Sequence, residues 1–435
     1  MKKFFAGIIF LAFCSLVLPA TDMRLTATDA VQMALENNIS LKQAQISFNS
    51  LKRQKWTSYG GLIPSVNGSF TIHSPNEKPV APLAYDYTLS AGVNISWTIT
   101  PMMFTNIFQA KLSYDSGEIS YEQATRSIEL SVRQLFANLL YQSAYAEAQE
   151  KNLKLLEEQY RQASTLYRNG RTSELDMMSA QVRMETAKPS VLSARINYDN
   201  NLDQFKNLLG IPSDTNLLLD GDLSGIFAIK EIDFSSLSGK SLDVAAAEQS
   251  LKIAKFGLLA ARINLYSPVI QLGWGYQPSA TNETLDQDWK DGGSFSATIS
   301  LSVDKFLPLS SYCQQVFSAK DNVRNAELNL SNTITNFQTQ LSSSMRTIIQ
   351  SRQAVESLKS SYELSEKTLE MTRIAYNSGV KDYLSLQSAT DSRLQSEVAL
   401  LQGALGLFVS ILDYENKLNL PFGTISSLAV PAESN

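Results

Sequence analysis

The residues that could carry chemistry are few in this chain of 435 residues. The one histidine, His73, lies in an expected loop or strand end, without a cysteine or second histidine nearby to complete a metal site. Glutamates occur in pairs, Glu157 with Glu158 and Glu363 with Glu366, as a general acid and base would require. Neighbouring lysines and arginines on a helical pattern are typical of a solvated helix face. We expect no catalytic residue and no metal ligand among them.

Two other features that could have indicated chemistry also have structural explanations. Gly292 and Gly293 precede an expected strand, without the Lys-Ser or Lys-Thr that follows the glycines of a phosphate-binding loop. Cys313 is the only cysteine outside the first 20 residues, so no disulfide framework is expected, and it is predicted to pack between helices. The sequence therefore predicts a protein that is not an enzyme and has no cofactor.

The first 20 residues have the three regions of a secretory signal peptide. Two lysines precede the apolar stretch 4–18, and the small residue Ala20 marks the expected cleavage site. We therefore expect the protein to leave the cytoplasm. The alternative is a lipoprotein signal with acylation of Cys14, but the bulky Phe13 stands where such sites prefer a small residue.

Charge and hydropathy exclude two classes of protein. The chain carries a net charge of −5 and has no basic stripe that could follow a phosphate backbone, which argues against nucleic acid as a partner. No stretch after the signal peptide approaches the roughly 18 to 20 consecutive apolar residues of a membrane-spanning helix. A helical membrane protein is therefore not expected, whereas a membrane β-barrel stays open.

A helical pattern of about a hundred residues runs from Val323 to Pro421. Gly379 stands at the position of a helix C-cap, and the apolar pattern resumes at Leu384 until proline stops it. Two long antiparallel helices are predicted. The first has apolar or small residues in steps of three or four that sum to seven, as in a coiled coil: Val323, Ala326, Leu330, Ile334, Phe337, Leu341, Met345, Ile348, Val355, Leu358 and Tyr362.

The same succession of motifs occurs earlier in the chain. Gly379 and Pro421 each lie 209 residues after a counterpart, Gly170 in Tyr-Arg-Asn-Gly and Pro212 in Leu-Gly-Ile-Pro. So long a period indicates a tandem duplication of a whole layout. The predicted organisation is a signal peptide (1–20), a first structural repeat (21–217), a linker (218–237), a second structural repeat (238–421) and a C-terminal tail (422–435).

Each repeat begins with a predicted helix (26–59 and 241–264), followed by two segments in which apolar and polar residues alternate. The pairs cover about 66–99 and 269–303, and polar loops join their members: 73–86, with Pro75, Pro79 and Pro82, and 277–293, with Asn282, Asp286 and Asp288. About ten alternating residues match a tilted membrane strand, although a soluble sandwich with one wet face alternates in the same way. Two features favour the membrane: the polar faces hold almost only Ser, Thr, Asn and Gly, and aromatic residues lie near strand ends, namely Trp97, Trp274, Tyr276 and Phe295.

Four strands cannot close a barrel, and open edges in lipid leave backbone groups unsatisfied at a cost of several kcal/mol each. Several protomers are therefore expected to share one barrel. The long helix pairs, about 107–208 and 309–418, begin with helices of some 60 residues, or roughly 90 to 100 Å. Such helices have to project away from the membrane.

These features resemble the TolC-like outer membrane efflux proteins, and the resemblance covers essentially the whole chain after the signal peptide. It implies a mainly α fold with membrane β: duplicated long coiled-coil helical hairpins forming a periplasmic α-barrel, and four strands per protomer in a shared trimeric 12-stranded β-barrel. It implies a homotrimer in the cell outer membrane, in contact with outer membrane lipid, whose tunnel extends into the periplasm. The implied function is the exit duct of a tripartite efflux or type I secretion system, with a periplasmic adaptor protein and an inner-membrane transporter as partners.

The resemblance also implies a gate where the hairpins turn, near Gly170 and Gly379. Tyr376 and Lys381 match the turn tyrosine and the following basic residue of the family, and Asp176 matches an acidic residue after the first turn. We expect these three residues to hold the two hairpins together. The family's interior aspartates do not carry over, because this chain has Ser385 and Ser388 there; Asp382 is a substitute candidate but has the position of a helix N-terminal acid.

A competing interpretation is a periplasmic coiled-coil protein with a structural or adhesive role and no pore. Such a scaffold has no need for two pairs of uncharged alternating segments, which a pore lined by Ser, Thr and Asn does need. Heat-modifiable trimer migration and single-channel conductance distinguish the two. A periplasmic chaperone-like binder, the third possibility, would require a concave apolar groove.

Overall fold

The structure, a computed structural model, describes residues 23–76, 86–221, 232, 234, 237, 239–281 and 292–425. Several sequence predictions lie outside these residues: the signal peptide with Cys14, most of the linker, and most of the C-terminal tail. The central parts of both strand-connecting loops, with Pro79, Pro82, Asn282, Asp286 and Asp288, also lie outside them.

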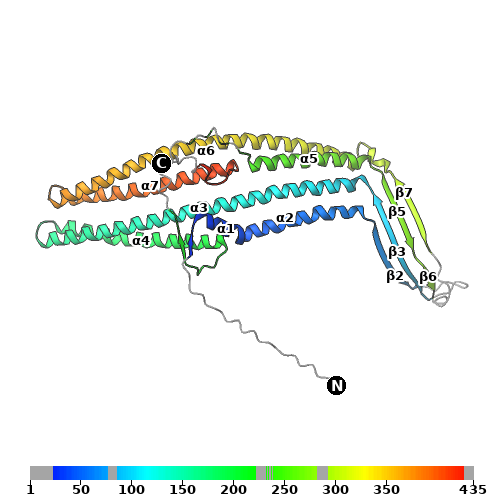
Figure 1. Cartoon of the computed structure of the whole chain (residues 1–435), viewed down its shortest axis with the longest axis horizontal. Coiled ribbons are helices and arrows are strands. Elements are labelled where there is room, and N and C mark those ends of the chain that lie inside the picture. The colour runs from blue at the N-terminus through cyan, green and yellow to red at the C-terminus, as the bar shows by residue number, and fades with distance from the viewer. Residues whose placement is uncertain are drawn as a thin grey trace, which may run out of the picture.

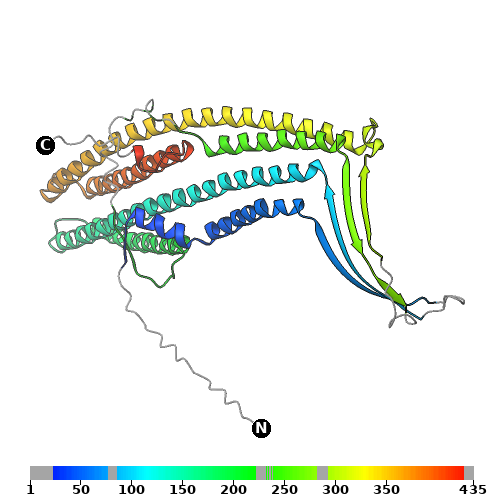
Figure 2. The ribbon, with the colours of Figure 1, turned by 45° about the vertical axis from the view of Figure 1, so that its right-hand side comes forward.

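Four long helices form two antiparallel hairpins (Figure 1). They are α3 (Pro101–Arg168) with α4 (Glu174–Leu209), and α6 (Ser311–Asn377) with α7 (Tyr383–Lys417). With 68 residues, α3 is about 100 Å long at 1.5 Å per residue. Figure 2 shows, as Figure 1 does, that the sheet lies at the end of the molecule opposite the hairpin turns. The predicted long helical arms and the mainly α fold are confirmed.

Three shorter helices lie alongside the long ones: α1 (Ala27–Asn37), α2 (Ile39–Thr57) and α5 (Leu242–Tyr266). The prediction of one continuous helix over 26–59 was wrong, because Asn38 divides it. The Asn38 carboxamide oxygen accepts a hydrogen bond from the Leu41 amide at 3.1 Å and caps α2. Its nitrogen donates to the Leu208 carbonyl at 2.9 Å, so the break joins α2 to the end of α4.

The strands form one antiparallel sheet in the order β2-β3-β5-β7, with the short β6 extending along β3. Register places Val66 opposite Ile95, Ile95 opposite Trp274, and Trp274 opposite Phe295, so the apolar residues share one face. The predicted strand that continued to Val303 ends at Ser300 instead, and a 3₁₀ turn follows. The elements are β2 (Ser65–His73), β3 (Thr88–Ile99), β5 (Val269–Tyr276), β6 (Ser279–Thr281), β7 (Ser294–Ser300), and the 3₁₀ turns η1 (Ser58–Leu62) and η4 (Val303–Phe306).

A small parallel sheet near the middle of the helices was not predicted. β1 (Met23–Leu25) pairs with β4 (Leu217–Leu219), which brings the start of the described chain against the segment after α4. Leu25 is buried in a core cluster with Phe136 of α3 and Phe205 of α4. The N-terminal segment is thereby fixed about halfway along α3.

One described helix, α7, is long enough and apolar enough over one stretch to cross a membrane. Its apolar residues have another explanation. Leu400, Leu407 and Ile411 are buried in one cluster with Ile348 and Val355 of α6. Packing within the second hairpin therefore accounts for part of the apolar composition of α7.

Candidate gate at the hairpin turns

The two hairpin turns have the same backbone construction. Gly170 has φ 65° and Gly379 has φ 74°, a left-handed conformation in which a Cβ would be strained. The amide after each glycine donates to the carbonyl five residues earlier: Arg171 to Leu166 at 2.8 Å and Val380 to Ala375 at 2.9 Å. These are the hydrogen bonds of a glycine-terminated helix, which explains why the Tyr-x-x-Gly motif occurs twice.

The returning helices begin with polar caps. The Ser173 hydroxyl accepts from the Asp176 amide at 3.1 Å, and the Asp382 carboxylate accepts from the Ser385 amide at 2.9 Å. The hydrogen bonds with Ser385 hold the pKa of the exposed Asp382 below its usual range. Asp382 is thus the N-cap of α7, the position that the sequence indicated as the alternative to gating.

A tyrosine cluster lies next to the turns, on the side toward the sheet. Tyr383 is 4% exposed and packs with Ala163 and Ala180 of the first hairpin, and the Tyr376 ring lies edge-on at 6.1 Å from it. The hydroxyls of both tyrosines are buried without a hydrogen-bond partner within the described chain. Burial raises the pKa of both, and for Tyr376 the nearby Asp176 raises it further. The pair has unused donors at the contact between the hairpins.

Sequence reasoning missed Tyr383, although one signal was available. The small residues Ala163 and Ala180 leave room for a large ring, and Tyr383 stands in the first turn of α7, directly after the Asp382 cap. Their contact across two hairpins depends on tertiary structure, which the pattern of one helix cannot reveal.

Three polar contacts between the hairpins were also missed. The Gln162 carboxamide donates to the Asn377 carboxamide, and Arg183 forms an ion pair with Asp391. The buried Gln159 donates to the Thr390 hydroxyl at 2.9 Å. These contacts join α3 to α6, α4 to α7, and α3 to α7, so each helix of one hairpin is tied to the other.

The three residues predicted to hold the hairpins together, Asp176, Tyr376 and Lys381, are only partly brought together in the protomer. Asp176 is half-buried and near enough to influence Tyr376, but its carboxylate accepts from the Thr172 hydroxyl at 2.9 Å. Lys381 is exposed, and among the described residues no ion pair joins it to Asp176. Ser385 and Ser388, where the family has interior acids, are half-buried and exposed.

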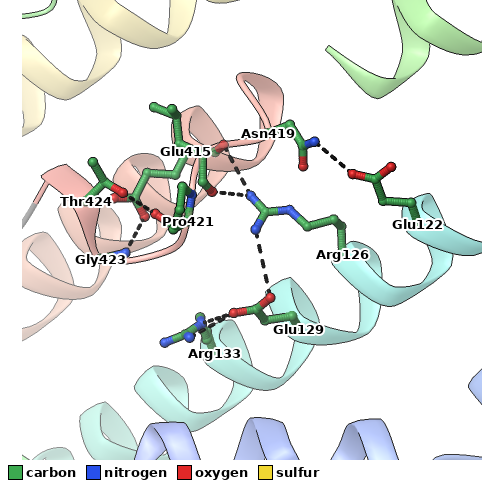
Figure 3. A network of polar contacts seen from close by, with 10 residues as sticks. Glu122, Arg126, Glu129, Arg133, Glu415, Asn419, Pro421, Gly423 and Thr424 are labelled. Carbon is green, nitrogen blue, oxygen red and sulfur yellow. Dashed lines mark hydrogen bonds and ion pairs between the residues drawn. The ribbon is translucent and has the colours of Figure 1, made fainter. Parts of the chain in front are cut away.

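A second polar network joins the repeats near the other end of α7 (Figure 3). Arg126 of α3 donates to the Leu420 carbonyl and, at 3.4 Å, to the Glu415 carbonyl, and it lies 3.8 Å from Glu129. Its guanidinium lies 4.0 Å from the centre of the Phe422 ring. The segment after α7 is therefore clamped onto the first repeat.

Glu415 anchors this segment from the other side. Its side chain is fully buried, and its two oxygens accept from the Ile425 amide at 2.7 Å and the Gly423 amide at 2.9 Å, the latter visible in Figure 3. Burial raises the pKa of this carboxyl, while the two amides oppose the change. The position is structural, since both oxygens are used within the fold. Among the described residues, no group of three or more His, Cys, Asp or Glu could hold a metal ion.

Two long hairpins, tied to each other at their turns and ending in a sheet with one apolar face, define a class of protein: long helical arms attached to a sheet of the membrane type. Comparison with known proteins gives the family. Residues 30–211 match the family model of outer membrane efflux proteins. The toxin and drug export protein A of Aggregatibacter actinomycetemcomitans is 22% identical over 385 residues, or 86% of this chain and 81% of that protein.

Solved structures share the whole fold at low identity. The outer membrane channel CmeC of Campylobacter jejuni matches with TM-score 0.77 and 18% identity, over 92% of this chain and 88% of its own. A membrane protein of Pseudomonas aeruginosa matches with TM-score 0.77 and 17% identity, over 90% of each chain. The channel MtrE of Neisseria gonorrhoeae, in its open state, matches with TM-score 0.73 and 18% identity, over 91% and 89%.

The family match over residues 30–211 and the fold of the whole chain confirm the predicted resemblance to the TolC-like outer membrane efflux proteins. The location of the chain is the outer membrane, with the helices extending into the periplasm. The matched family is one of channels.

Proposed function

We propose that three copies of this chain form the exit duct of a tripartite efflux or type I secretion system. The observation that carries the proposal is the open sheet of the protomer. Within the described part of the chain, β2 and β7 each have one unpaired edge, while one face of the sheet is apolar and the other holds mainly Ser, Thr, Asn and Gly. In a membrane both edges need partners, and edge pairing between three copies closes a barrel of twelve strands.

The test measures the mass and the channel conductance of the protein on the same preparation. We expect the detergent-solubilised protein to have the mass of three chains and to insert into planar bilayers as a channel. A monodisperse monomer without conductance would contradict the proposal. A stable trimer without conductance would favour the competing function, a periplasmic scaffold that uses the same helices.

The duct is passive, so transport energy comes from an inner-membrane transporter reached through a periplasmic adaptor. In support, the relative from Aggregatibacter is named as exporting toxins and drugs. Deleting the gene should increase sensitivity to toxic compounds or abolish secretion of a protein, and the affected substrate distinguishes efflux from type I secretion. A deletion strain unchanged in both respects would contradict a role in export.

For the gate, we propose that Tyr376 and Lys381 hold the second hairpin against Asp176 of the first when the tunnel is closed. Supporting this, Tyr376 is half-buried with an unused hydroxyl, and Asp176 is close enough to raise its pKa. Lys381, exposed in the protomer, is free to reach Asp176 of a neighbouring copy. An adaptor would open the tunnel by replacing these contacts.

The double variant Tyr376→Phe with Lys381→Glu should raise single-channel conductance. The matched control is Tyr167→Phe with Arg171→Glu, which makes the same changes beside the first turn. If the test variant conducts no better than wild type and control, the contacts that close the tunnel involve other residues. Because Ser385 and Ser388 replace the interior acids, we also expect little block by divalent cations added from the periplasmic side.

A further inference from the structure

The corner where helices give way to the sheet exposes an aromatic pair. α2 ends at Thr57, the turn η1 follows, and β2 begins at Ser65. In this corner Trp56 is 71% exposed and Tyr59 48% exposed, with ring centroids 6.4 Å apart. Indole and phenol rings are amphipathic and concentrate where a membrane surface meets water.

Unpaired positive charges accompany these rings. Lys52 and Arg53 are exposed on the last turns of α2, and no carboxylate of the described chain pairs with either. Lys52 precedes Trp56 by one helical turn, so the two share a face. Lys55 differs, since its ammonium lies 4.2 Å from the centre of the Tyr114 ring on the face packed against α3.

The second repeat has the same combination. Arg262 is exposed near the end of α5, without a carboxylate partner among the described residues. Tyr266, one turn later, is 66% exposed and lies 5.8 Å from the Phe306 ring. Two independent corners thus place an unpaired cation one turn before an exposed aromatic ring, at the end of the helix that leads into the sheet.

We propose that these two corners form a collar that binds the headgroups of anionic phospholipids in the periplasmic leaflet of the outer membrane. The collar continues the apolar face of the sheet, on which Val66 is 65% and Phe70 is 65% exposed. Its rings lie at the level of the acyl–headgroup boundary and its cations meet lipid phosphates. The collar residues are Lys52, Arg53, Trp56, Tyr59, Arg262 and Tyr266.

A neighbouring protomer is the competing occupant, and charge argues against it. Subunit contact would bury Lys52, Arg53 and Arg262, which have no carboxylate partner among the described residues of their own protomer, so a neighbouring copy would have to supply an acid for each of them. Phosphate groups at a wet interface supply the missing partners. The proposal rests on the outer membrane location and is independent of what the duct transports.

The test compares two charge-matched variants of the full-length trimer. Lys52→Glu with Arg262→Glu reverses one collar charge in each repeat. The control, Lys42→Glu with Lys252→Glu, reverses exposed lysines ten residues earlier on the same helices, about 15 Å further from the sheet. Binding of phosphatidylglycerol and phosphatidylcholine to detergent-solubilised trimers is counted by native mass spectrometry, alongside bilayer conductance.

We expect wild type and control to retain phosphatidylglycerol in preference to phosphatidylcholine. The collar variant should bind phosphatidylglycerol at least tenfold more weakly, since each basic residue near an anionic surface accounts for roughly fivefold. Its conductance should be unchanged. Equal loss in both variants would overturn the site in favour of general electrostatics, and loss of the trimer in the collar variant would show a subunit contact. Competition by inorganic phosphate alone would exclude a membrane lipid as the specific ligand.

Discussion

The strongest prediction concerns the N-terminus: Cys14 does not anchor this protein in the outer membrane through a lipid. Cys14→Ser should leave membrane location, trimer yield and conductance unchanged. The mature chain should begin after Ala20, only two residues ahead of β1.

The distance between Cys14 and the bilayer surface follows from where β1 lies. Leu25 of β1 is buried in one cluster with Val132 of α3, and α3 begins at the sheet with Pro101. The 31 residues between Pro101 and Val132 correspond to about 47 Å of helix. The nine residue steps from Cys14 to Met23 span at most about 32 Å when fully extended. An acylated Cys14 would therefore fall about 15 Å short of the bilayer surface, unless β1 were pulled out of the core.

Two measurements check this reasoning. Intact mass of the purified protein should show cleavage after Ala20, and metabolic labelling with an alkyne-bearing fatty acid should leave it unlabelled. A known lipoprotein from the same cells is the positive control. A mature chain beginning with a labelled Cys14 would refute the argument, and it would imply that the β1–β4 pairing opens in the membrane.

Four further predictions concern side chains with defined surroundings. Asp in place of Trp97 or Trp274, both on the apolar face of the sheet, should reduce assembly of the membrane trimer by roughly 2 kcal/mol or more near midplane and less near the interface; unchanged yield in both would contradict the strand assignment. Glu415→Gln should destabilise the trimer by about 1 to 3 kcal/mol in thermal melting, because the amide can accept from only one of the two backbone amides that the carboxylate now serves; a melting point equal to wild type would refute that view. Gly379→Ala should cost roughly 1 to 2 kcal/mol through its positive φ, whereas Gly406→Ala, within α7, should not destabilise. Burial raises the pKa of Glu397, so the folded state binds its proton more tightly than the unfolded state does; thermal stability should fall as pH rises from the ordinary glutamate pKa through the raised one, and this component should disappear in Glu397→Gln.

Much of the fold was predictable because its signals are local and long. The α6 pattern from Val323 to Tyr362 extends over many turns, and Gly379 marks the place where it must reverse. The alternation of β3 likewise assigns each residue to a face, since the period of a strand is two. The order of elements recurs in the second half, while the predicted repeat and linker boundaries stay predictions.

The elements that were missed depend on pairing between distant residues. Nothing near Met23 in the sequence announces that it will pair with Leu217. Asn38 resembles any helical asparagine until the Leu208 carbonyl is found beside it. Both contacts form where the first helix meets the end of α4, so each requires the hairpin to have folded back. Such contacts follow from tertiary structure and leave little trace in periodicity.

The candidate gate likewise contains features that the sequence predicts and contacts that depend on tertiary structure. Gly170, Gly379 and the Asp382 cap follow from turn chemistry, which acts over a few residues and can be read directly. The packing of Tyr383 against Ala163 and the Arg183–Asp391 ion pair join the two hairpins, and the second pair lies 208 residues apart in sequence. A helical duct needs both kinds of contact. In the proposed gate, the local turns keep each hairpin closed whatever the state of the tunnel, and an adaptor exchanges the partly exposed polar contacts between the hairpins without unfolding either arm.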